Sequence, residues 1–248
     1  MELKGKNIIV TGGAGGIGSA IVRLLIENDA NPVIIDNNNE LMRQFENEYA
    51  EITIYNCDVR DYSQVVQCVH SIIGHIGTIH GLVNCAGIVE NIPLVRVTDD
   101  GLIAHEIEAW DNVISTNLDG VFYMTANVVK SMLTNRTHGV IVNVSSVVST
   151  GNAGQSAYAA SKAAINSLTV SWANELGPLG IRVGAVSPGL IDTPMRYSIN
   201  ESAQDDLIQR TPSRRTGKPD EIALAVLFIF QNDFYSGKII EIDGGIRF

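Results

Sequence analysis

Short apolar runs rich in β-branched residues alternate along the whole chain with longer stretches of mixed polarity. Most of the short runs show no alternation of apolar and polar positions, which is typical of strands covered on both faces. The pattern predicts seven strands, at Asn7–Thr11, Pro32–Asp36, Ile52–Cys57, Gly81–Cys85, Val140–Ser145, Ile181–Val186 and Lys238–Ile242.

The stretches between these runs carry apolar residues at the i, i+3 and i+4 spacing of amphipathic helices. In the stretch Asp61–Ile76, for example, Val65 and Ile72 fall on one broad apolar face. We expect Asp61 to cap this helix and Gln64 to reach back to it in a capping box. Regular alternation of strands and helices predicts an α/β fold, with a doubly wound parallel sheet, right-handed crossovers and helices on both faces.

The chain of 248 residues is long enough for one such domain and too short for two, so we expect a single domain over residues 1–248. Ligands of parallel sheets bind beyond the carboxyl ends of the strands. Two irregular stretches, at about 88–105 and 189–217, each follow a strand and should lie at that edge. We expect them to be substrate loops, with plain connecting loops as the alternative.

Composition excludes several classes of protein. The net charge of −10 argues against a nucleic-acid partner, because phosphate-binding surfaces are basic. No apolar run reaches the roughly 18–20 residues that span a bilayer, so no membrane partner is expected. Cys57, Cys68 and Cys85 are too few and too scattered for a disulfide framework or a metal site. The first residues lead directly into a strand and leave no room for a signal peptide, which predicts a cytoplasmic protein.

A glycine-rich turn, Thr11–Gly18, follows the first strand and opens the helix expected at Ser19–Asn28. Glycines let the backbone turn tightly and approach a pyrophosphate, whose charge then meets the N-terminus of the helix. The letters also fit the pattern G-x-G-x-x-G starting at Gly13, so the register stays open at this point. The place of the turn between a strand and a helix predicts a dinucleotide cofactor.

The second strand ends at Asp36, 18 residues after Gly18. A carboxylate at this position can accept hydrogen bonds from the ribose hydroxyls of the adenosine and would repel a 2′-phosphate. The glycine-rich turn contains no Arg or Lys, and Asn37 follows Asp36. These features predict NAD rather than NADP, with the alternative that Asp36 merely ends the strand.

Tyr158 and Lys162 lie four residues apart and therefore share one face of a helix. A nearby ammonium stabilises phenolate and would lower the pKa of the tyrosine from its ordinary value of about 10. Tyr158 could then exchange protons near neutral pH. The pair follows the serines Ser145 and Ser146 at the end of a strand, where a hydroxyl could hold a substrate oxygen while hydride moves.

These motifs together resemble the short-chain dehydrogenase/reductase family, and the resemblance covers essentially the whole chain. The turn Thr11–Gly18 matches the family's cofactor turn T-G-x-x-x-G-x-G, and Cys57–Val59 resembles its adenine-binding segment. Asn84–Gly87 resembles the N-N-A-G motif, with a departure at Cys85 that touches no expected chemical role. The register set by the match runs through Gly12, Gly16 and Gly18.

Asn117 matches the family's catalytic asparagine, Tyr158 and Lys162 match Y-x-x-x-K, and Ser187–Thr193 matches the loop that embraces the nicotinamide. The resemblance implies a Rossmann-like fold and an enzyme that transfers a hydride between NAD(H) and a secondary alcohol or ketone. The implied cofactor-binding residues are Gly12, Gly16, Ile17, Gly18, Asp36, Asp58, Val59, Asn84, Ala86, Gly87, Tyr158, Lys162, Pro188, Gly189, Ile191 and Thr193.

The resemblance also implies a catalytic relay of four residues. Tyr158 would be the general acid in reduction and the general base in oxidation. Lys162 would lower the pKa of Tyr158 and bind the ribose of the nicotinamide. Ser146 would orient the substrate oxygen, and Asn117 would hold a water that links Lys162 to solvent. NAD would carry the hydride, while the protein would supply positioning and electrostatics.

Two alignments compete for the serine. Family members commonly place it 13 positions before the tyrosine, which is Ser145 here, whereas the strand-end motif aligns Ser146, at 12 positions. A deletion of one residue in the intervening loop reconciles the two. We prefer Ser146.

Substrate identity stays open at the level of sequence. One alternative is a reductase of 3-oxoacyl thioesters carried on acyl carrier protein or CoA, which usually favours NADPH and would want basic residues near Asp36. Another is a non-catalytic NAD-binding sensor, which need not keep the four residues of the relay. The apolar side chains expected around a small-molecule substrate are Val147, Val148, Ala153, Leu190, Met195 and Tyr197.

Small residues beside the catalytic pair, Ala159, Ala160, Ala163 and Ala164, leave a flat surface for close packing. In relatives of this type the corresponding helix is often a subunit interface. A homotetramer is implied by this analogy alone.

Overall fold

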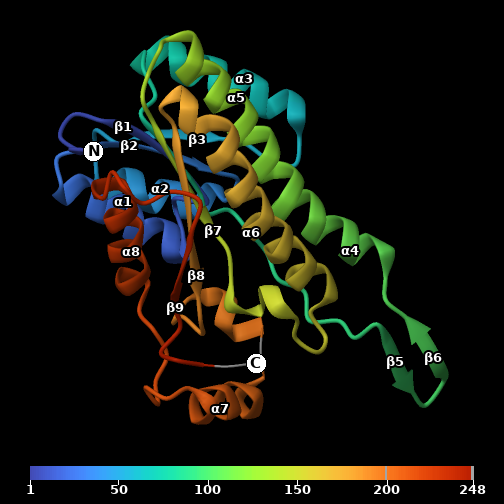
Figure 1. Cartoon of the computed structure of the whole chain (residues 1–248). Coiled ribbons are helices and arrows are strands. Elements are labelled where there is room, and N and C mark those ends of the chain that lie inside the picture. Colours follow the sequence, from blue (N-terminus) through green and yellow to red (C-terminus); the bar gives the residue numbers. More distant parts are fainter. Residues whose placement is uncertain (199, 247–248) are drawn as a thin grey trace.

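Seven parallel strands form one sheet in the computed structural model (Figure 1). They are β1 (Asn7–Thr11), β2 (Asn31–Asp36), β3 (Thr53–Asn56), β4 (Gly81–Asn84), β7 (Val140–Val144), β8 (Arg182–Pro188) and β9 (Ile239–Ile242). Their order is β3-β2-β1-β4-β7-β8-β9, so the chain first builds outward from β1 on one side and then on the other. The doubly wound, Rossmann-like sheet in a single domain confirms the predicted fold.

Helices cover both faces of this sheet (Figure 1). One face carries α1, α2 and α8, and the other carries α3, α5 and α6. The helices are α1 (Gly16–Glu27), α2 (Asn39–Glu48), α3 (Tyr62–Ile76), α4 (Ile107–Ile114), α5 (Gly120–Thr134), α6 (Ser156–Leu176), α7 (Glu201–Arg210) and α8 (Pro219–Gln231), with short turns η1 (Ser115–Asp119), η2 (Val147–Thr150), η3 (Gly177–Leu179) and η4 (Pro194–Ser198).

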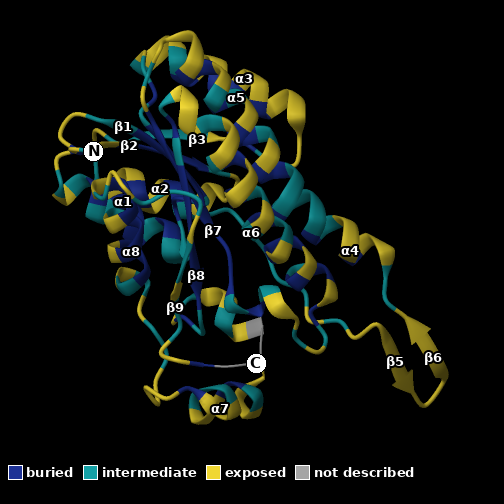
Figure 2. Cartoon of the chain, in the orientation of Figure 1, coloured by how far each residue is buried: buried dark blue, intermediate teal, exposed yellow. Residues whose placement is uncertain are grey.

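Each central strand supplies side chains to two cores, one on either face of the sheet. In β1, Ile8 and Val10 pack in the core shared with α1 and α8, whereas Ile9 packs in the core shared with α3, α5 and α6. Successive side chains of a strand point to opposite faces. The central strands β1, β4 and β7 are therefore almost wholly buried (Figure 2), which explains their unbroken apolar runs in the sequence, whereas the edge strands β3 and β9 are only partly covered.

Both stretches predicted as irregular contain regular elements. The stretch 88–105 includes a hairpin, β5 (Val95–Thr98) and β6 (Gly101–Ala104), which forms a separate two-stranded sheet. The stretch 189–217 includes η4 and α7. The hairpin gives no signal of a buried strand because all of its strand residues are exposed.

The start of α3 matches the sequence prediction in part. Asp61 caps the helix, because its Oδ1 accepts hydrogen bonds from Ser63 N and Gln64 N. Gln64 reaches back as predicted, because its Nε2 donates to Asp61 Oδ2 at 3.1 Å, but the capping box is incomplete, because Gln64 Oε1 accepts from the backbone N–H of Asp58 at 3.2 Å instead of that of Asp61. Gln64 thereby ties the helix to the segment that follows β3.

The structure describes residues 1–198 and 200–246. Residues 199 and 247–248, which belong to the predicted loop 189–217 and to the end of the predicted domain 1–248, lie outside the described residues. Within the described ranges, no helix is both long and apolar enough to cross a membrane. The same ranges hold no group of three or more His, Cys, Asp or Glu side chains arranged to bind a metal ion.

Candidate active site

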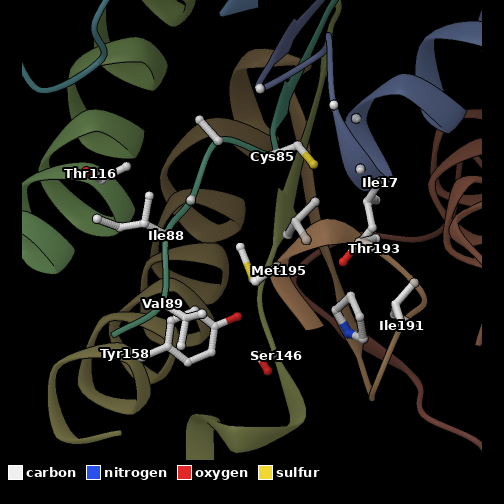
Figure 3. A pocket seen from close by; sticks show the side chains of 18 of the residues that line it. Ile17, Cys85, Ile88, Val89, Thr116, Ser146, Tyr158, Ile191, Thr193 and Met195 are labelled. Carbon is white, nitrogen blue, oxygen red and sulfur yellow. The ribbon is translucent and has the colours of Figure 1, made fainter. Parts of the chain in front are cut away.

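A cavity of about 610 Å³ opens beyond the carboxyl ends of β1, β2, β4, β7 and β8, where the strand order reverses (Figure 3). The side chains of Asn84 and Asn117 are not among those that line it. The other predicted site residues do line it: Gly12, Gly16, Ile17, Gly18, Asp36, Asp58, Val59, Ala86, Gly87, Ser146, Tyr158, Lys162, Pro188, Gly189, Ile191 and Thr193.

The turn between β1 and α1 requires glycine at three positions. Gly12 and Gly16 have φ angles of +64° and +48°, in the left-handed region that favours glycine. A Cβ on Gly18 would lie only 2.1 Å from the carbonyl oxygen of Gly12. These are the three positions of the register that the family resemblance sets.

The turn leads directly into the first turn of α1. The residue before the helix is Gly15, which has no side chain to cap it, and the first turn holds no acidic residue. The first N–H groups of a helix lack partners within the helix, and the helix dipole favours an anion beside them. Gly16 faces Thr193 across the cavity, since a Cβ there would lie 3.6 Å from Thr193 Cγ2. This cradle can hold a pyrophosphate.

Asp36 at the end of β2 organises the backbone around it. Its Oδ1 accepts from Asn37 N at 2.9 Å and from Asn38 N at 3.0 Å, and its Oδ2 accepts from Ala14 N at 3.1 Å. The carboxylate thus joins the turn after β2 to the glycine-rich turn. Sequence reasoning identified Asp36 as a ligand group but missed this structural role.

Arg60 lines the cavity next to the adenine-binding segment, and Asp58 engages its charge. Arg60 Nη2 lies 2.6 Å from Asp58 Oδ2, and Arg60 Nε lies 3.0 Å from each oxygen of the carboxylate. Hydrogen bonding to Arg60 lowers the pKa of Asp58. Asp36 lines this end of the cavity as well. The positive charge of Arg60 is already paired with Asp58 and is therefore not free to offset the charge of Asp36.

Asn84, predicted to touch the cofactor, is buried behind the cavity wall. Its Nδ2 donates to Thr125 Oγ1 and to Asn143 Oδ1, each at 2.9 Å, and Asn143 Nδ2 donates to Thr169 Oγ1. This network fastens the end of β4 to β7, α5 and α6. Asn143 was missed as a site-supporting residue, although an amide inside the apolar run of β7 was a visible signal.

Thr11 supports the opposite side of the same wall. Its Oγ1 accepts from the backbone N–H groups of Cys85 and Ala86, at 3.0 and 3.1 Å. These bonds therefore tie the end of β1, where the glycine-rich turn begins, to the loop after β4. Cys85, the departure from the family motif, points its sulfur into the cavity (Figure 3), and burial raises its pKa to about 12.

The two adjacent serines face different surroundings. Ser145 is 2 % exposed, and its Oγ donates to the backbone carbonyl of Lys162 at 3.2 Å. Ser146 lines the cavity beside Tyr158 (Figure 3), and its hydrogen bond with that phenol offsets part of the rise in pKa that burial causes there. Both serines line the cavity, and the choice of Ser146 as the catalytic serine stays a prediction.

Lys162 is buried beneath Tyr158. Its Nζ donates to the carbonyl of Val144 at 2.8 Å and lies 5.6 Å from the centroid of the Tyr158 ring. Burial lowers the pKa of Lys162 to about 8. Burial also raises the pKa of Tyr158, so the lowered value that the Y-x-x-x-K spacing predicts is not reached in this structure. The largest cause is the burial of the phenol itself, while Lys162 donates to the carbonyl of Val144.

Asn117 occupies the wide helical turn η1 between α4 and α5. Its Oδ1 accepts from Ile88 N and its Nδ2 donates to Ile88 O, both at 2.9 Å. A Cβ on Gly87 would lie 3.3 Å from Asn117 Oδ1 and 3.6 Å from Lys162 Nζ. Asn117 thus fixes the loop after β4 next to Lys162, from just outside the cavity.

The remaining wall of the cavity is mostly apolar. Val147, Val148, Leu190 and Met195 line it as the sequence predicted, whereas Ala153 and Tyr197 do not. Further apolar residues that the sequence analysis missed are Ile88, Val89, Leu207 and Ile246. Leu207 comes from α7, so this helix forms part of the apolar wall.

Comparisons with known proteins agree over the whole length. The sequence profile of a family described as Enoyl-(Acyl carrier protein) reductase matches residues 12–247. The chain is 40% identical over 253 residues to the 3-oxoacyl-(acyl-carrier-protein) reductase FabG of Thermotoga maritima, with 99% of both chains covered.

Two solved structures are similar as well. A gluconate 5-dehydrogenase from Burkholderia cenocepacia, solved in complex with NADP and tartrate, has a TM-score of 0.89 and 32% identity, covering 99% of this chain and 96% of that one. A short-chain dehydrogenase/reductase described as a glucose/ribitol dehydrogenase, from Brucella melitensis, has a TM-score of 0.88 and 30% identity, covering 100% and 98%.

Proposed function

The chain belongs to the short-chain dehydrogenase/reductase family of oxidoreductases, and from this premise we propose that it is an NADH-dependent reductase of 3-oxoacyl thioesters. The observation that carries the proposal is the 40% identity, along 99% of both chains, to a relative named as a 3-oxoacyl-(acyl-carrier-protein) reductase. Sequence alone favoured an unspecified secondary alcohol or ketone and kept the thioester reductase as the alternative. The relatives favour the thioester.

The glycine-rich turn supports binding of a dinucleotide, because its backbone leaves no room for side chains where a pyrophosphate would approach. Gly12, Gly16, Ile17 and Gly18 would hold the pyrophosphate, and Asp36 the ribose of the adenosine. The residues proposed around the adenine and the nicotinamide are Asp58, Val59, Ala86, Gly87, Pro188, Gly189, Ile191 and Thr193. Asn84 would act behind them by fixing the strand ends.

The choice of NAD rests on Asp36. Oδ2 of its carboxylate accepts only from Ala14 N and keeps a lone pair, so it can accept from a ribose hydroxyl, and the charge of the carboxylate would repel a 2′-phosphate. Arg60, the cation that could offset this repulsion, is paired with Asp58. The NADP in the similar gluconate 5-dehydrogenase belongs to that protein and leaves the preference of this chain to be measured.

Reduction of the 3-oxo group needs one hydride and one proton. The nicotinamide supplies the hydride to the carbonyl carbon when it is bound. Tyr158 donates its phenolic proton to the carbonyl oxygen, which becomes the hydroxyl of the 3-hydroxyacyl product. Ser146 orients the carbonyl oxygen and stabilises the negative charge that develops on it.

Lys162 and Asn117 would complete the relay. The ammonium of Lys162 would bind the ribose of the nicotinamide and stabilise the phenolate of Tyr158 after the proton has left. Since the side chain of Asn117 is engaged with Ile88, its main chain in the wide turn η1 is the group proposed to hold the water that returns a proton. This use of all four residues disfavours a non-catalytic sensor.

The two stretches 88–105 and 189–217 are proposed as the substrate side of a single catalytic domain. Ile88, Val89, Leu190 and Met195 line the cavity from these stretches and can hold an acyl chain. A nicotinamide-dependent reaction draws on the intracellular cofactor pool, so we propose a cytoplasmic location. A homotetramer is proposed by family analogy.

The test is a substrate comparison with the purified chain and NADH. We expect consumption of NADH with 3-oxoacyl thioesters, on CoA and on acyl carrier protein, at a kcat/KM at least about tenfold above that for sugar-acid ketones. The Tyr158→Phe variant serves as the background. If the chain reduces a sugar-acid ketone while its rates with thioesters do not exceed that background, the thioester proposal is rejected in favour of another ketone substrate.

A further inference from the structure

Two of the three cysteines meet at the end of β3, and the proposed catalytic relay uses neither of them. Cys57 follows β3 directly, and Cys68 lies in the second turn of α3. Both are free thiols, 2 % and 7 % exposed, in the core between the sheet and α3. The two side chains form a hydrogen bond with each other. We refer to Cys57 and Cys68 as the thiol pair.

Hydrogen bonds on either side of the thiol pair hold β3 and α3 in one register. The backbone N–H of Asp58 donates to Gln64 Oε1 at 3.2 Å, one helical turn before the thiol of α3. Tyr55, two residues back along the strand and on the same face, places its Oη 3.3 Å from His75 Nδ1, two turns further along α3. The contact between the thiols is therefore fixed by its neighbours on both elements.

The segment that holds Cys57 also shapes the adenosine end of the cavity. Cys57 lines the cavity, whereas Cys68 does not. The backbone N–H of Cys57 donates to the carbonyl of Asp36 at 3.0 Å, and Asp58 and Val59 continue the cavity wall. A displacement of Cys57 is thus passed to the residues proposed to bind the adenosine.

We propose that the thiol pair is a modification site, at which hydrogen peroxide forms a disulfide that weakens binding of the cofactor. Non-bonded atoms in contact are about 3.5–4 Å apart, whereas the sulfur atoms of a disulfide are about 2 Å apart, so the thiols must approach by roughly 1.5–2 Å. The helix α3 is anchored by its buried face, whereas β3 is a partly covered edge strand. The movement therefore falls on the segment after β3.

The chemistry needs no group other than the peroxide. The Cys68 thiol donates its hydrogen bond to the Cys57 sulfur, which lowers the pKa of Cys57 and raises that of Cys68, so Cys57 supplies the thiolate. This thiolate attacks one peroxide oxygen, the O–O bond breaks, and the other oxygen leaves as water after taking up the proton that Cys57 lost. Cys57 is then a sulfenic acid.

Cys68 completes the reaction by attacking the oxidised sulfur. The S–S bond forms, the S–O bond breaks, and the hydroxyl leaves as water with the proton of Cys68. The two thiols have then lost two electrons and two protons, and one peroxide has become two waters. A dithiol reductant reverses the modification.

The inference rests on the proposed binding of a dinucleotide and does not depend on the substrate. Because Cys57 lines the cavity, peroxide reaches it from there and a bound cofactor covers it. At an NAD concentration about 100-fold above its dissociation constant only about 1% of the chain is free, so the disulfide should form at least about tenfold more slowly.

The test exposes the reduced full-length chain to hydrogen peroxide and then blocks the remaining thiols. Trypsin cleaves after Arg60 and releases Cys57 and Cys68 on separate peptides, so the disulfide appears as a joined mass. We expect this mass together with a dissociation constant of NADH raised at least about tenfold, and dithiothreitol should restore both. Fluorescence titration measures the binding.

Cys68→Ala removes the second thiol without touching the cavity wall. It should form no joined mass, and the dissociation constant of NADH should change less than about threefold after the same exposure. The matched control is Cys85→Ala, which removes the third cysteine and should leave the joined mass in place. Each variant is compared with its own reduced form, so that the effect of the substitution itself cancels.

The outcomes separate this proposal from the proposed function. A wild type without the joined mass, a disulfide that leaves NADH binding unchanged, or an equal loss of binding in Cys68→Ala would overturn the proposal. Equal rates of disulfide formation with and without NAD would overturn the route through the cavity. A reduced chain that binds no dinucleotide would reject the proposed function, while the joined mass still decides whether the thiol pair forms a disulfide.

Discussion

Ser145 and Ser146 are neighbours in sequence and both line the cavity, but their hydroxyls have different partners. Because Ser146 turns toward Tyr158, we predict that Ser146→Ala lowers kcat by roughly 10²–10³, the cost of losing a well-placed donor to a developing oxyanion. Ser145→Ala removes a donor to the carbonyl of Lys162 and should cost stability, about 1–3 kcal/mol, with kcat reduced less than about tenfold. Both are measured at saturating cofactor, and a larger kcat loss at Ser145 would reverse the assignment.

The phenol of Tyr158 is the proposed proton donor, and Tyr158→Phe removes only that hydroxyl. We predict that turnover falls to background while the dissociation constant of NADH changes less than about threefold, since the ring that packs against the cavity remains. Fluorescence titration measures binding and NADH consumption measures turnover. A variant that keeps more than about a tenth of wild-type kcat would remove Tyr158 from the role of general acid.

Burial makes the charged form of Lys162 less favourable in the folded protein than the charged form of a solvent-exposed lysine. Its pKa of about 8 in the folded protein lies below the ordinary lysine value, so the unfolded chain binds more protons between pH 8 and the ordinary value. Stability therefore rises with pH across this window, and the penalty for charging Lys162 is fully present below it.

Lys162→Met removes this titration along with catalysis. We predict that the free energy of unfolding of the wild type gains about 2 kcal/mol relative to Lys162→Met between pH 7 and pH 9.5. Urea denaturation of both chains at the two pH values measures it. A difference between the chains that stays constant with pH would mean that Lys162 titrates normally.

The turn that joins β1 to α1 is the element in which packing is tightest. A Cβ on Gly18 would lie 2.1 Å from the carbonyl oxygen of Gly12, so Gly18→Ala must open the turn. We predict a loss of about 1–3 kcal/mol of stability and binding of NADH weakened at least about tenfold. Thermal denaturation and cofactor titration measure the two effects.

Gly74 offers a matched control for Gly18. It lies within α3, is exposed, and has no atom within 4 Å of an added Cβ. Gly74→Ala should stabilise the protein by about 0.5–1 kcal/mol, since alanine favours a helix interior, and should leave cofactor binding unchanged. Equal behaviour of the two alanine variants would contradict the role of the turn.

Elements were predictable where burial left a mark in the sequence. The strands of the main sheet are sandwiched, so Ile8, Ile9 and Val10 read as one apolar run, and the seven predicted strands match within about one or two residues. The hairpin β5–β6 left no such mark, because it covers no core.

The site divides in the same way. Glycines, Asp36 and the pair Tyr158–Lys162 were predictable, because their chemistry depends on local spacing. The motifs identified Asn84 and Asn117 but could not predict their geometry. A motif does not show that the amide of Asn84 forms a hydrogen bond from β4 to β7, or that the amide of Asn117 forms one with Ile88. The direction of Lys162 toward Val144 is likewise a tertiary fact.

At the scale of the whole molecule, a cofactor that binds only the folded chain raises its stability by mass action. At a concentration about 100-fold above the dissociation constant, the gain is about 2.7 kcal/mol. For a chain of this size each kcal/mol raises Tm by about 2–4 °C. NADH is therefore expected to raise Tm by about 5–10 °C, which makes Tm a readout of cofactor choice that does not depend on knowing the substrate.

We predict that NADPH at the same concentration raises Tm by about half as much or less, because the charge of Asp36 repels the 2′-phosphate and Arg60 is committed to Asp58. The informative variant is Asp36→Asn rather than Asp36→Ala. Alanine would leave the N–H groups of Ala14, Asn37 and Asn38 without their acceptor, whereas asparagine keeps the shape, removes the charge and retains one acceptor oxygen for Asn37 N and Asn38 N, losing only the acceptor of Ala14 N. Each variant is compared with its own Tm without cofactor. The gap between NADH and NADPH should narrow in Asp36→Asn, and equal shifts in the wild type would refute the preference for NAD.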